Sequence, residues 1–324
     1  MNNAIILRPL GRTDMMVTPI GLGCWQFSKQ NNFVGKFWPV LDNDTVNKIV
    51  TLSLEGGINW FDTAEVYGNG ASEKALSEAL LKAGKKPGDV LVATKWWPGM
   101  RFASSIGKTI NDRVSSLSPF PIDLHQVHQS IGFSGAAKEM EEMALLYEKK
   151  LIKHIGVSNH QESRMRKAWE TLGKKNIALA TNQMPYSLLN RKIESNGVMS
   201  AAKELGITII AYSPLAQGLL TGKFHDNPGL LNNIGYRKYM PNFSRKGMEK
   251  SLPVIKLVKE LAEKYNVSTS QIALNWLINF SGNTVVAIPG ATKESHVKEN
   301  TGAMAFRLSE EDMDRLDKVS AIFK

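Results

Sequence analysis

Four residues whose side chains can hold or move a proton stand at or just after short apolar runs: Asp62, Tyr67, Lys95 and His128. A tyrosine has an ordinary pKa of about 10, and a buried ammonium group beside it is expected to lower that pKa. A carboxylate partner keeps such a lysine charged when it is buried. The pattern predicts Tyr67 as general acid/base, Lys95 as the group that tunes it, Asp62 as the partner of Lys95, and His128 as the residue that orients a substrate oxygen.

Each of these residues also has a structural reading when it is taken alone. An Asp–Lys pair is commonly a structural ion pair, a loop tyrosine packs, and a histidine at a strand end is commonly hydrogen-bonded in the core. Their succession at neighbouring strand ends favours the functional reading. His125 and His128 lie three apart in an expected strand and so point to opposite faces. No Cys or His cluster supplies a third ligand, so no metal site is predicted.

Apolar runs alternate with helical patterns along the whole chain. The expected strands are 20–23, 58–61, 90–94, 122–127, 154–157, 179–182, 208–211 and 284–288. Eight strand–helix alternations without a Pro/Gly-rich linker predict one domain, 1–324, folded as a closed (β/α)8 TIM barrel. The alternative is a doubly wound sheet, which usually carries G-x-G-x-x-G after its first strand. The stretch Gly21 to Gln26 lacks the third glycine of that motif.

Helical patterns and turn signals complete the expected architecture. Helices are predicted at 72–84 with Ser72 as N-cap, and at 136–150, 161–172, 197–205, 253–265, 268–280 and from 309 onward. Residues 5–9 and 17–18 predict a hairpin that caps one mouth of the barrel. The connections 26–41 and 218–245 are long enough to be functional lids over the face where the strands end.

Composition excludes several classes of protein. The chain has 324 residues, 43% hydrophobic and 22% charged, which is ordinary for a globular protein, and no apolar run is long enough for a membrane span. One cysteine and no secretory signal favour the cytoplasm. The net charge of +10 is scattered over many lysines without aromatic interleaving, so no nucleic-acid partner is expected. The oligomeric state stays open.

The later strand ends are polar as well. They are Ser158-Asn159, Asn182-Gln183 and Tyr212-Ser213. Amide and hydroxyl groups in these places could hold a flat ring that bears an amide, with Tyr212 as a stacking face. A strand also ends and a helix begins near Thr292 and Lys293, which is a favourable place for an anion, and Lys223 offers a second cation.

The motifs together resemble the aldo-keto reductase family, and most closely its bacterial and potassium-channel-β-like branches. They are Gly21-Leu22-Gly23 with Trp25, Asn59 to Ala64 with Tyr67-Gly68, Lys95, Asp123-Leu124 with His128, Gly156 to Asn159, Asn182-Gln183, Ala211 to Leu215 with Gly218 to Gly222, Ile288-Pro289-Gly290 and Glu299-Asn300. They follow the family's order and spacing over nearly the whole chain.

The resemblance implies an NADP(H)-dependent oxidoreductase that reduces aldehydes and ketones to alcohols by hydride transfer, with Tyr67 as proton donor and Asp62, Tyr67, Lys95 and His128 as its catalytic tetrad. NAD(H) is the alternative cofactor, because His296 stands where Gln or Arg is common. The implied cofactor-binding residues are Gly23, Cys24, Trp25, Asp62, Ser158, Asn159, Gln183, Tyr212, Ser213, Pro214, Leu215, Gln217, Gly218, Lys223, Arg237, Ile288, Gly290, Thr292, Lys293, His296, Glu299 and Asn300. Trp25, Phe27, Trp96 and Trp97, with Phe33, are expected to line a substrate pocket for aromatic or aliphatic carbonyl compounds.

Two other functions are compatible with the same residues. One is an NADP(H)-bound accessory or redox-sensing protein of the channel-β type, which turns over slowly with an intact tetrad. The other is a cofactor-free aldolase that forms a Schiff base on Lys95. Asp62 disfavours the aldolase, because it keeps Lys95 charged and therefore not nucleophilic.

Overall fold

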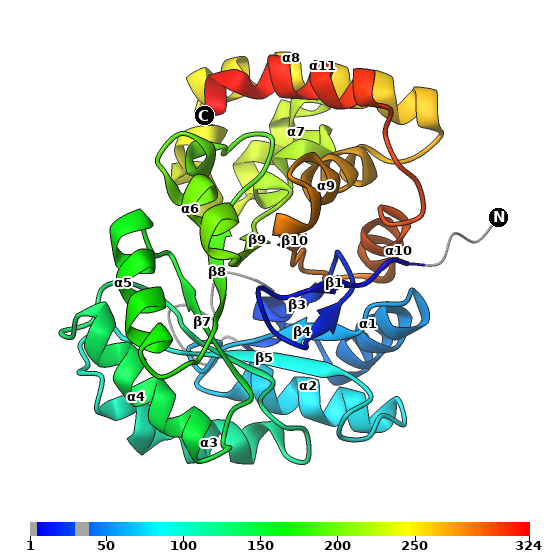
Figure 1. Cartoon of the computed structure of the whole chain (residues 1–324). Helices are drawn as coiled ribbons and strands as arrows, with labels where there is room; N and C mark the ends of the chain where they lie inside the picture. Colours follow the sequence, from blue (N-terminus) through cyan, green and yellow to red (C-terminus); the bar gives the residue numbers. More distant parts are fainter. Residues whose placement is uncertain (1–4, 30–38) are drawn as a thin grey trace.

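The computed structural model describes residues 5–29 and 39–324, and eight parallel strands lie at its centre with helices around them (Figure 1). The strands are β3 (Leu22–Gly23), β4 (Trp60–Asp62), β5 (Leu91–Trp96), β6 (Leu124–Val127), β7 (His154–Ser158), β8 (Leu179–Pro185), β9 (Thr208–Tyr212) and β10 (Val285–Ala287). Each overlaps one of the predicted strands, so the predicted barrel is confirmed and the doubly wound sheet is excluded.

The sheet runs in chain order from β3 to β10, and its two ends meet. Isolated parallel bridges join Ile20 to Ala287 and Gly23 to Gly290. The Gly21 amide donates to the Ala287 carbonyl at 2.9 Å, which adds to this seam. Because the strands are parallel, all of their carboxyl ends open on the same face of the barrel.

The helices confirm most of the predicted pattern. They are α1 (Asn43–Glu55), α2 (Ala71–Lys82), α3 (Ser105–Leu117), α4 (Ala136–Glu148), α5 (Glu162–Gly173), α6 (Val198–Leu205), α7 (Lys223–Asp226), α8 (Arg245–Tyr265), α9 (Thr269–Phe280), α10 (Glu294–Gly302) and α11 (Glu310–Ser320). Helices α1 and α3 were not predicted, and α8 begins at Arg245, where Ser244 caps it, and not at Pro253. None of the helices in the described ranges is long and apolar enough to cross a membrane.

The predicted N-cap role of Ser72 is wrong. Helix α2 begins after Gly70, and its cap makes no side-chain hydrogen bond. The Ser72 hydroxyl instead donates to the Cys24 carbonyl at 2.6 Å and accepts from the Thr63 hydroxyl at 2.9 Å. The side chain therefore ties the start of α2 to the carboxyl ends of β3 and β4.

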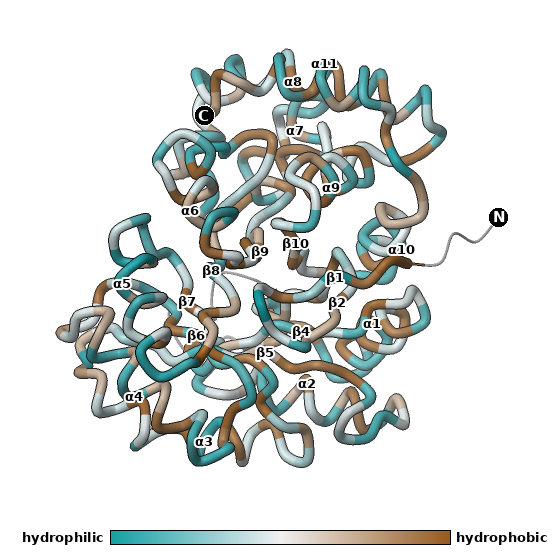
Figure 2. Tube along the Cα trace, viewed as in Figure 1, coloured by the Kyte–Doolittle hydropathy of each residue, from teal (hydrophilic) through white to brown (hydrophobic). Residues whose placement is uncertain are grey.

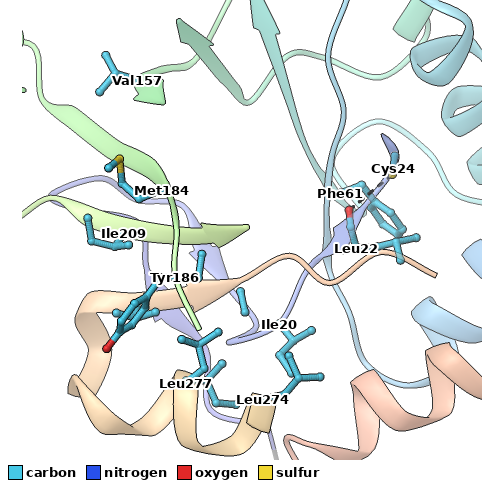
Figure 3. Close-up of a cluster of buried hydrophobic side chains, with 14 of the residues drawn as sticks. Ile20, Leu22, Cys24, Phe61, Val157, Met184, Tyr186, Ile209, Leu274 and Leu277 are labelled. Atoms are coloured by element: carbon cyan, nitrogen blue, oxygen red, sulfur yellow. Dashed lines mark hydrogen bonds between the residues drawn. The ribbon is translucent and has the colours of Figure 1, made fainter. Parts of the chain in front are cut away.

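The hydrophobic core has two layers. The larger layer lies between the barrel wall and the helices, and Figure 3 shows Ile20, Leu22 and Phe61 from the wall together with Leu274 and Leu277 of α9. Figure 2 shows the same division along the chain, with apolar segments at the strands and alternating polarity on the helices. This alternation is typical of helices that cover a sheet with one face only.

The smaller layer fills the barrel and is closed by the N-terminal hairpin. Its barrel members are Trp60, Ala93, Leu124, Ala180, Ile210, Val286 and Ile288. The hairpin strands β1 (Arg8–Pro9) and β2 (Met16–Val17) are antiparallel, and Leu10, Met15 and Val17 pack onto this inner layer. The predicted cap over one mouth is thus confirmed, and the opposite mouth is where the polar strand ends gather.

Two long connections were predicted as functional lids. The first, 26–41, lies partly outside the described residues. The second, 218–245, is a succession of short helices that includes α7 and the 3-10 helices η5 (Pro228–Asn233), η6 (Gly235–Tyr239) and η7 (Pro241–Phe243). Phe224 and Phe243 anchor it through an edge-to-face contact with ring centroids 5.4 Å apart.

Candidate active site

Asp62 and Lys95 form a fully buried ion pair inside the carboxyl-end mouth of the barrel. Lys95 Nζ contacts Asp62 Oδ1 and also donates to the Thr63 carbonyl at 2.8 Å. Strand alternation explains the placement, because Asp62 shares the inward face with Trp60, and Lys95 shares it with Ala93. Burial alone would lower the pKa of Lys95, but Asp62 and Tyr67 outweigh it and raise the pKa. Lys95 therefore carries its charge, as predicted.

Two glutamines complete the surroundings of the Asp62 carboxylate. Gln126 Nε2 and Gln183 Nε2 each donate to Asp62 Oδ2 at 3.0 Å. The sequence reading of Gln183 was a clamp for a ring amide, and in the structure its amide nitrogen is directed to Asp62. Gln126 was not predicted as part of the site. Gln126 lies on β6 two residues after the inward-facing Leu124, so strand alternation predicts that Gln126 also faces inward, and this signal was available in the sequence.

Tyr67 lies over Lys95, with the ammonium nitrogen 5.1 Å from the ring centroid. Burial raises the pKa of the Tyr67 phenol above its ordinary value, and Lys95 opposes this shift without overcoming it. The predicted net lowering of this pKa is therefore wrong, because burial was not visible in the sequence. A phenol that stays protonated is suited to donate a proton, and the adjacent ammonium stabilises the phenolate that donation leaves behind.

His128 faces Tyr67 across the mouth. The ring centroids lie 5.6 Å apart at 83°, and the Trp97 ring meets the imidazole edge-on at 5.3 Å. Burial, followed by repulsion from Lys95, lowers the pKa of His128 well below its ordinary value, so the imidazole is neutral. Its Nδ1 is buried and has no hydrogen-bond partner within the described ranges. A neutral imidazole in this position can donate one hydrogen bond to a substrate oxygen.

The four aromatic residues predicted to line the substrate pocket do not share one location. Trp97 contacts His128, and Trp25 stacks on Tyr67 with centroids 5.9 Å apart. Phe27 and Trp96 are each 1% exposed and belong to the outer core, so the structure contradicts their assignment to the pocket. Strand β5 continues through Trp96, so alternation turns this indole outward, where it donates to Ser105 Oγ at 3.1 Å. Phe33 lies outside the described residues.

An apolar platform that the sequence reading missed is formed by the loops that follow Trp97 and His128. It comprises Met100, Phe102, Ile131 and Phe133, all exposed. The two loops that carry these residues follow β5 and β6 and are joined by a hydrogen bond from the Phe133 amide to the Arg101 carbonyl at 3.0 Å. The Phe102 and Phe133 rings lie 5.2 Å apart. The signal was the repeated spacing, since both loops place apolar residues three and five positions after Trp97 and His128.

The polar groups that follow β7, β8 and β9 form one hydrogen-bonded set. Tyr212 Oη donates to Asn159 Oδ1 at 2.9 Å, and Asn159 Nδ2 donates to Ser158 Oγ at 2.9 Å and to the His128 carbonyl at 3.2 Å. Ser158 Oγ donates to the Gln183 carbonyl at 3.0 Å. The structure thus brings Ser158, Asn159, Gln183 and Tyr212 together next to His128, as the sequence predicted.

The segment after β9 makes a tight turn in which Ser213, Ala216, Gln217 and Gly218 all have positive φ angles. Gln217 Nε2 donates to Ser213 Oγ at 2.8 Å, and Arg237 Nη1 donates to the Gln217 carbonyl at 3.0 Å. At Leu215 and Ala216 a residue with negative φ is followed by one with positive φ, and turn conformations of this kind can direct peptide N–H groups toward one side, which suits an anion. Pro214 and Leu215 lie within the same turn.

Positive charge gathers beside this turn. Repulsion from Arg237 and Lys293 adds to burial in lowering the pKa of Lys223, and Lys293 and Lys223 act with burial to lower the pKa of His296. His296 Nδ1 accepts from the Thr292 amide at 3.3 Å. Helix α10 begins next to Lys293, without a side-chain cap. Three cations brought together from loop 218–245 and the start of α10 are a strong attraction for phosphate.

The remaining predicted cofactor residues lie around the same mouth. A Cβ on Gly23 would meet the Ile288 carbonyl at 2.8 Å. Position 23, which bridges to Gly290 where β3 meets β10, therefore has no room for a side chain. Asn300 is buried, and its Nδ2 lacks a partner among the described residues. The Glu299 charge acts on Lys223 and His296. Cys24 is fully buried, with its side chain in the core, so only its backbone can face a ligand.

Two buried histidines predict an acid-sensitive fold. Burial lowers the pKa of His125 to about 3 and that of His160 to about 4. Histidines in the unfolded chain titrate near 6.5, so below that pH the unfolded chain binds protons that the folded protein does not, and stability falls as the pH falls. Between pH 6.5 and 5, His125 alone is expected to lower the free energy of unfolding by roughly 2 kcal/mol.

Urea unfolding at pH 7 and at pH 5 tests this expectation. The free energy of unfolding should fall less between the two pH values for His125→Leu than for the wild type. Equal losses would contradict this assignment.

Comparison with known proteins agrees with this geometry. The family model described as "Aldo/keto reductase family" matches residues 19–321. A chloroplastic pyridoxal reductase of Arabidopsis thaliana is 30% identical over 94% of this chain and 83% of its own length. An uncharacterized oxidoreductase of Mycobacterium tuberculosis is 34% identical over 95% of this chain and 91% of its own.

Solved structures share the fold. The glycerol dehydrogenase of Gluconobacter oxydans superposes with a TM-score of 0.83 at 28% identity, covering 98% of this chain and 95% of that one. An aldo-keto reductase of Klebsiella pneumoniae, solved in complex with NADPH, gives a TM-score of 0.75 at 23% identity and covers 98% and 96% of the two chains. With the family model spanning nearly its whole length, this chain belongs to the aldo/keto reductase family.

Proposed function

We propose that the protein reduces aldehydes and ketones to alcohols with NADP(H), and that Tyr67 donates the proton. The observation that carries the proposal is a set of buried contacts: Asp62 pairs with Lys95, and Lys95 lies under the Tyr67 ring. The neutral His128 faces the same tyrosine. The ammonium of Lys95 is held by a carboxylate and the phenol stays protonated, which is the arrangement a proton donor needs before reaction. The same carboxylate contact argues against a Schiff base on Lys95.

The residues present fit a nicotinamide dinucleotide. The set Ser158, Asn159 and Gln183 offers amide and hydroxyl oxygens for a ring amide, since the amide nitrogens already donate within the protein, and Tyr212 offers a stacking face. The cluster of Lys223, Arg237 and Lys293 suits phosphates, and the helix that begins next to Lys293 also carries Asn300, whose buried amide nitrogen has no partner among the described residues. When bound, the cofactor would supply the hydride that the protein's own side chains cannot supply.

The chain's own residues account for the proton and for substrate placement. His128 donates a hydrogen bond to the carbonyl oxygen, and Tyr67 passes its phenolic proton to that oxygen as negative charge develops there. Lys95 then stabilises the phenolate. Trp25, Trp97 and the platform of Met100, Phe102, Ile131 and Phe133 offer apolar area, so the preferred substrates are carbonyl compounds with an aromatic or aliphatic arm.

Steady-state turnover tests this function. The protein is mixed with NADPH and a panel of aldehydes and ketones that differ in apolar length, and the loss of absorbance at the nicotinamide band is followed. We expect consumption of NADPH that rises with apolar length. An absence of turnover across the panel, with cofactor retained on gel filtration, would instead support an accessory or sensing role with bound NADP(H).

Lys293 is expected to set the preference for NADPH over NADH. The extra phosphate of NADPH gains a charge-assisted contact of about 1.5–3 kcal/mol from such a lysine. Lys293→Met should therefore raise KM for NADPH by about tenfold or more and leave KM for NADH nearly unchanged. Lys298→Met, an exposed lysine on the same helix, is the matched control and should change neither value. Parallel increases for both cofactors would place Lys293 outside the phosphate site.

A further inference from the structure

One arginine of α3 holds both acidic residues that flank the Tyr67 loop. Arg113 Nη1 donates to Glu65 Oε2 at 2.9 Å, and Arg113 Nε lies 2.8 Å from Glu73 Oε2 as an ion pair without hydrogen-bond alignment. Glu65 lies two residues before Tyr67, and Glu73 lies in the first turn of α2. The side chains of Arg113, Glu65 and Glu73 are 10%, 6% and 0% exposed, so this cluster, here named the Arg113 cluster, is mostly buried.

The Arg113 cluster reaches both members of the proton-donor pair. Thr94, the residue before Lys95, donates its hydroxyl to Glu73 Oε1 at 2.5 Å. On the other side, the Glu65 amide donates to the Lys95 carbonyl at 3.2 Å and the Glu65 carbonyl accepts from the Gly70 amide at 2.9 Å. Arg113 therefore connects the loop that carries Tyr67 to the strand that carries Lys95, without touching either side chain.

A cavity of about 480 Å³ opens beside the cluster, behind the Tyr67 loop. Its walls include Arg113, Glu65, Arg101, Asn69 and Trp97. Arg101 pairs with Glu65 through Oε1 and donates to the Trp97 carbonyl at 3.2 Å. Arg113 therefore forms part of the wall of this cavity, where small solutes can reach the position of its guanidinium.

We propose that Arg113 is a positioning residue for Tyr67 and Lys95, and that the reaction needs the Arg113 cluster to hold the phenol over the ammonium. This inference rests on the proposed reductase function. It follows from connectivity, because α3 has no other charged side chain that contacts both flanking acids among the described residues. A displacement of about 1 Å between reacting groups can cost about a hundredfold in rate, so a loose loop would be costly.

The charge state of Glu73 agrees with this role. Burial raises its pKa to about 7, while Arg113 and the Thr94 hydroxyl act in the opposite direction, with Glu65 and Lys95 as the other charges that act on it. Without Arg113, a carboxylate with no exposed surface would lose its main counter-charge and would take up a proton. The contact between Glu73 of α2 and Thr94 of β5 would then be a hydrogen bond to a neutral carboxylic acid.

Comparing Arg113→Ala with Arg191→Ala separates an effect on the position of Tyr67 and Lys95 from a general loss of stability. Arg191 is a second buried arginine that bridges two acids, Glu194 and Asp317, next to α11 and away from the mouth. Both variants are expected to lower the melting temperature. Only Arg113→Ala should lower kcat, by about tenfold to a hundredfold, while the Kd for NADPH from fluorescence quenching stays within about twofold.

Chemical rescue gives a second, independent readout. Because the cavity opens onto the position of Arg113, millimolar guanidinium should raise kcat of Arg113→Ala several-fold. Sodium chloride at equal ionic strength should not, and neither should guanidinium added to Arg191→Ala. Unchanged kcat in Arg113→Ala, a matching loss of NADPH affinity, or an absence of rescue would each overturn the positioning role.

Wild-type turnover is measured first, so a failure of the proposed function is recognised separately. If the wild type reduces no carbonyl, amide hydrogen exchange of residues 63–72 decides the positioning role. Arg113→Ala should then exchange faster than the wild type at the Tyr67 and Gly70 amides, which donate to the Ala64 and Glu65 carbonyls. Unchanged exchange, or the same increase in Arg191→Ala, would overturn it.

Discussion

Tyr67→Phe is expected to lower kcat for carbonyl reduction by about a hundredfold to ten-thousandfold, the usual contribution of a positioned general acid. The phenyl ring keeps the stacking on Trp25 and the contact with His128, so the mouth should retain its shape. The Kd for NADPH should stay within about twofold, because most of the residues proposed to bind the cofactor follow β7 to β10 and the ring of residue 67 is retained. Stopped-flow or steady-state absorbance and fluorescence titration measure the two quantities.

Tyr147→Phe is the matched control for this change. Tyr147 is a surface tyrosine on α4, 39% exposed, and the loss of its hydroxyl should alter neither kcat nor cofactor affinity. If Tyr67→Phe lost cofactor binding together with activity, Tyr67 would be a structural residue. If it kept full activity, another group would be the proton donor, and the neutral His128 would be the next to test.

The barrel was predictable because its signal is repeated. Each strand is a short apolar run, most of the predicted strands are followed by a polar residue, and parallel strands bring those ends to one face. Asp62, Lys95 and His128 could therefore be placed together before any coordinates were known. The placement of Ser158, Asn159 and Tyr212 on one face followed from the same argument, but the hydrogen bonds that join them were not predicted.

What escaped prediction depends on burial and on exact element ends. Trp96 was expected near the mouth, but β5 extends through it and alternation turns it outward. The pKa of Tyr67 is raised because burial outweighs Lys95, and only coordinates show how enclosed the phenol is. Ser72 looked like a helix cap, yet its hydroxyl has two better partners far away in sequence.

Hydrogen-bond and ion-pair networks between residues distant in sequence could not be predicted either. Helix α3 has apolar residues at helical spacing, Ile106, Ile110 and Leu117, yet it was not predicted, and the contacts of Arg113 with Glu65 and Glu73 were not foreseen. Contacts of this kind link residues 40 to 48 positions apart, and no local pattern specifies them. We propose that these contacts hold Tyr67 in place.

Arg191→Met is expected to lower the free energy of unfolding by about 3–5 kcal/mol, the usual cost of removing one partner from a buried ion pair. Arg191 Nε and Nη2 donate to the two carboxylate oxygens of Glu194 at 2.7 Å, and Nη1 donates to Ser320 Oγ at 2.7 Å. The guanidinium also lies 4.9 Å from the Trp276 ring centroid. Met replaces the volume and the ring contact but leaves the acids without their buried cation.

Urea unfolding measures this loss, and Arg166→Met is the matched control. Arg166 also bridges two acids, Glu162 and Glu204, but all three side chains are at least one-third exposed, so its removal should cost at most about 1 kcal/mol. Lys324, 3.0 Å from Asp317, retains part of the charge balance in Arg191→Met, so the loss should grow further when Lys324 is also replaced. Equal losses for Arg191→Met and Arg166→Met would mean that the C-terminal helix α11 is held by its apolar face alone, and that burial adds nothing to this ion pair.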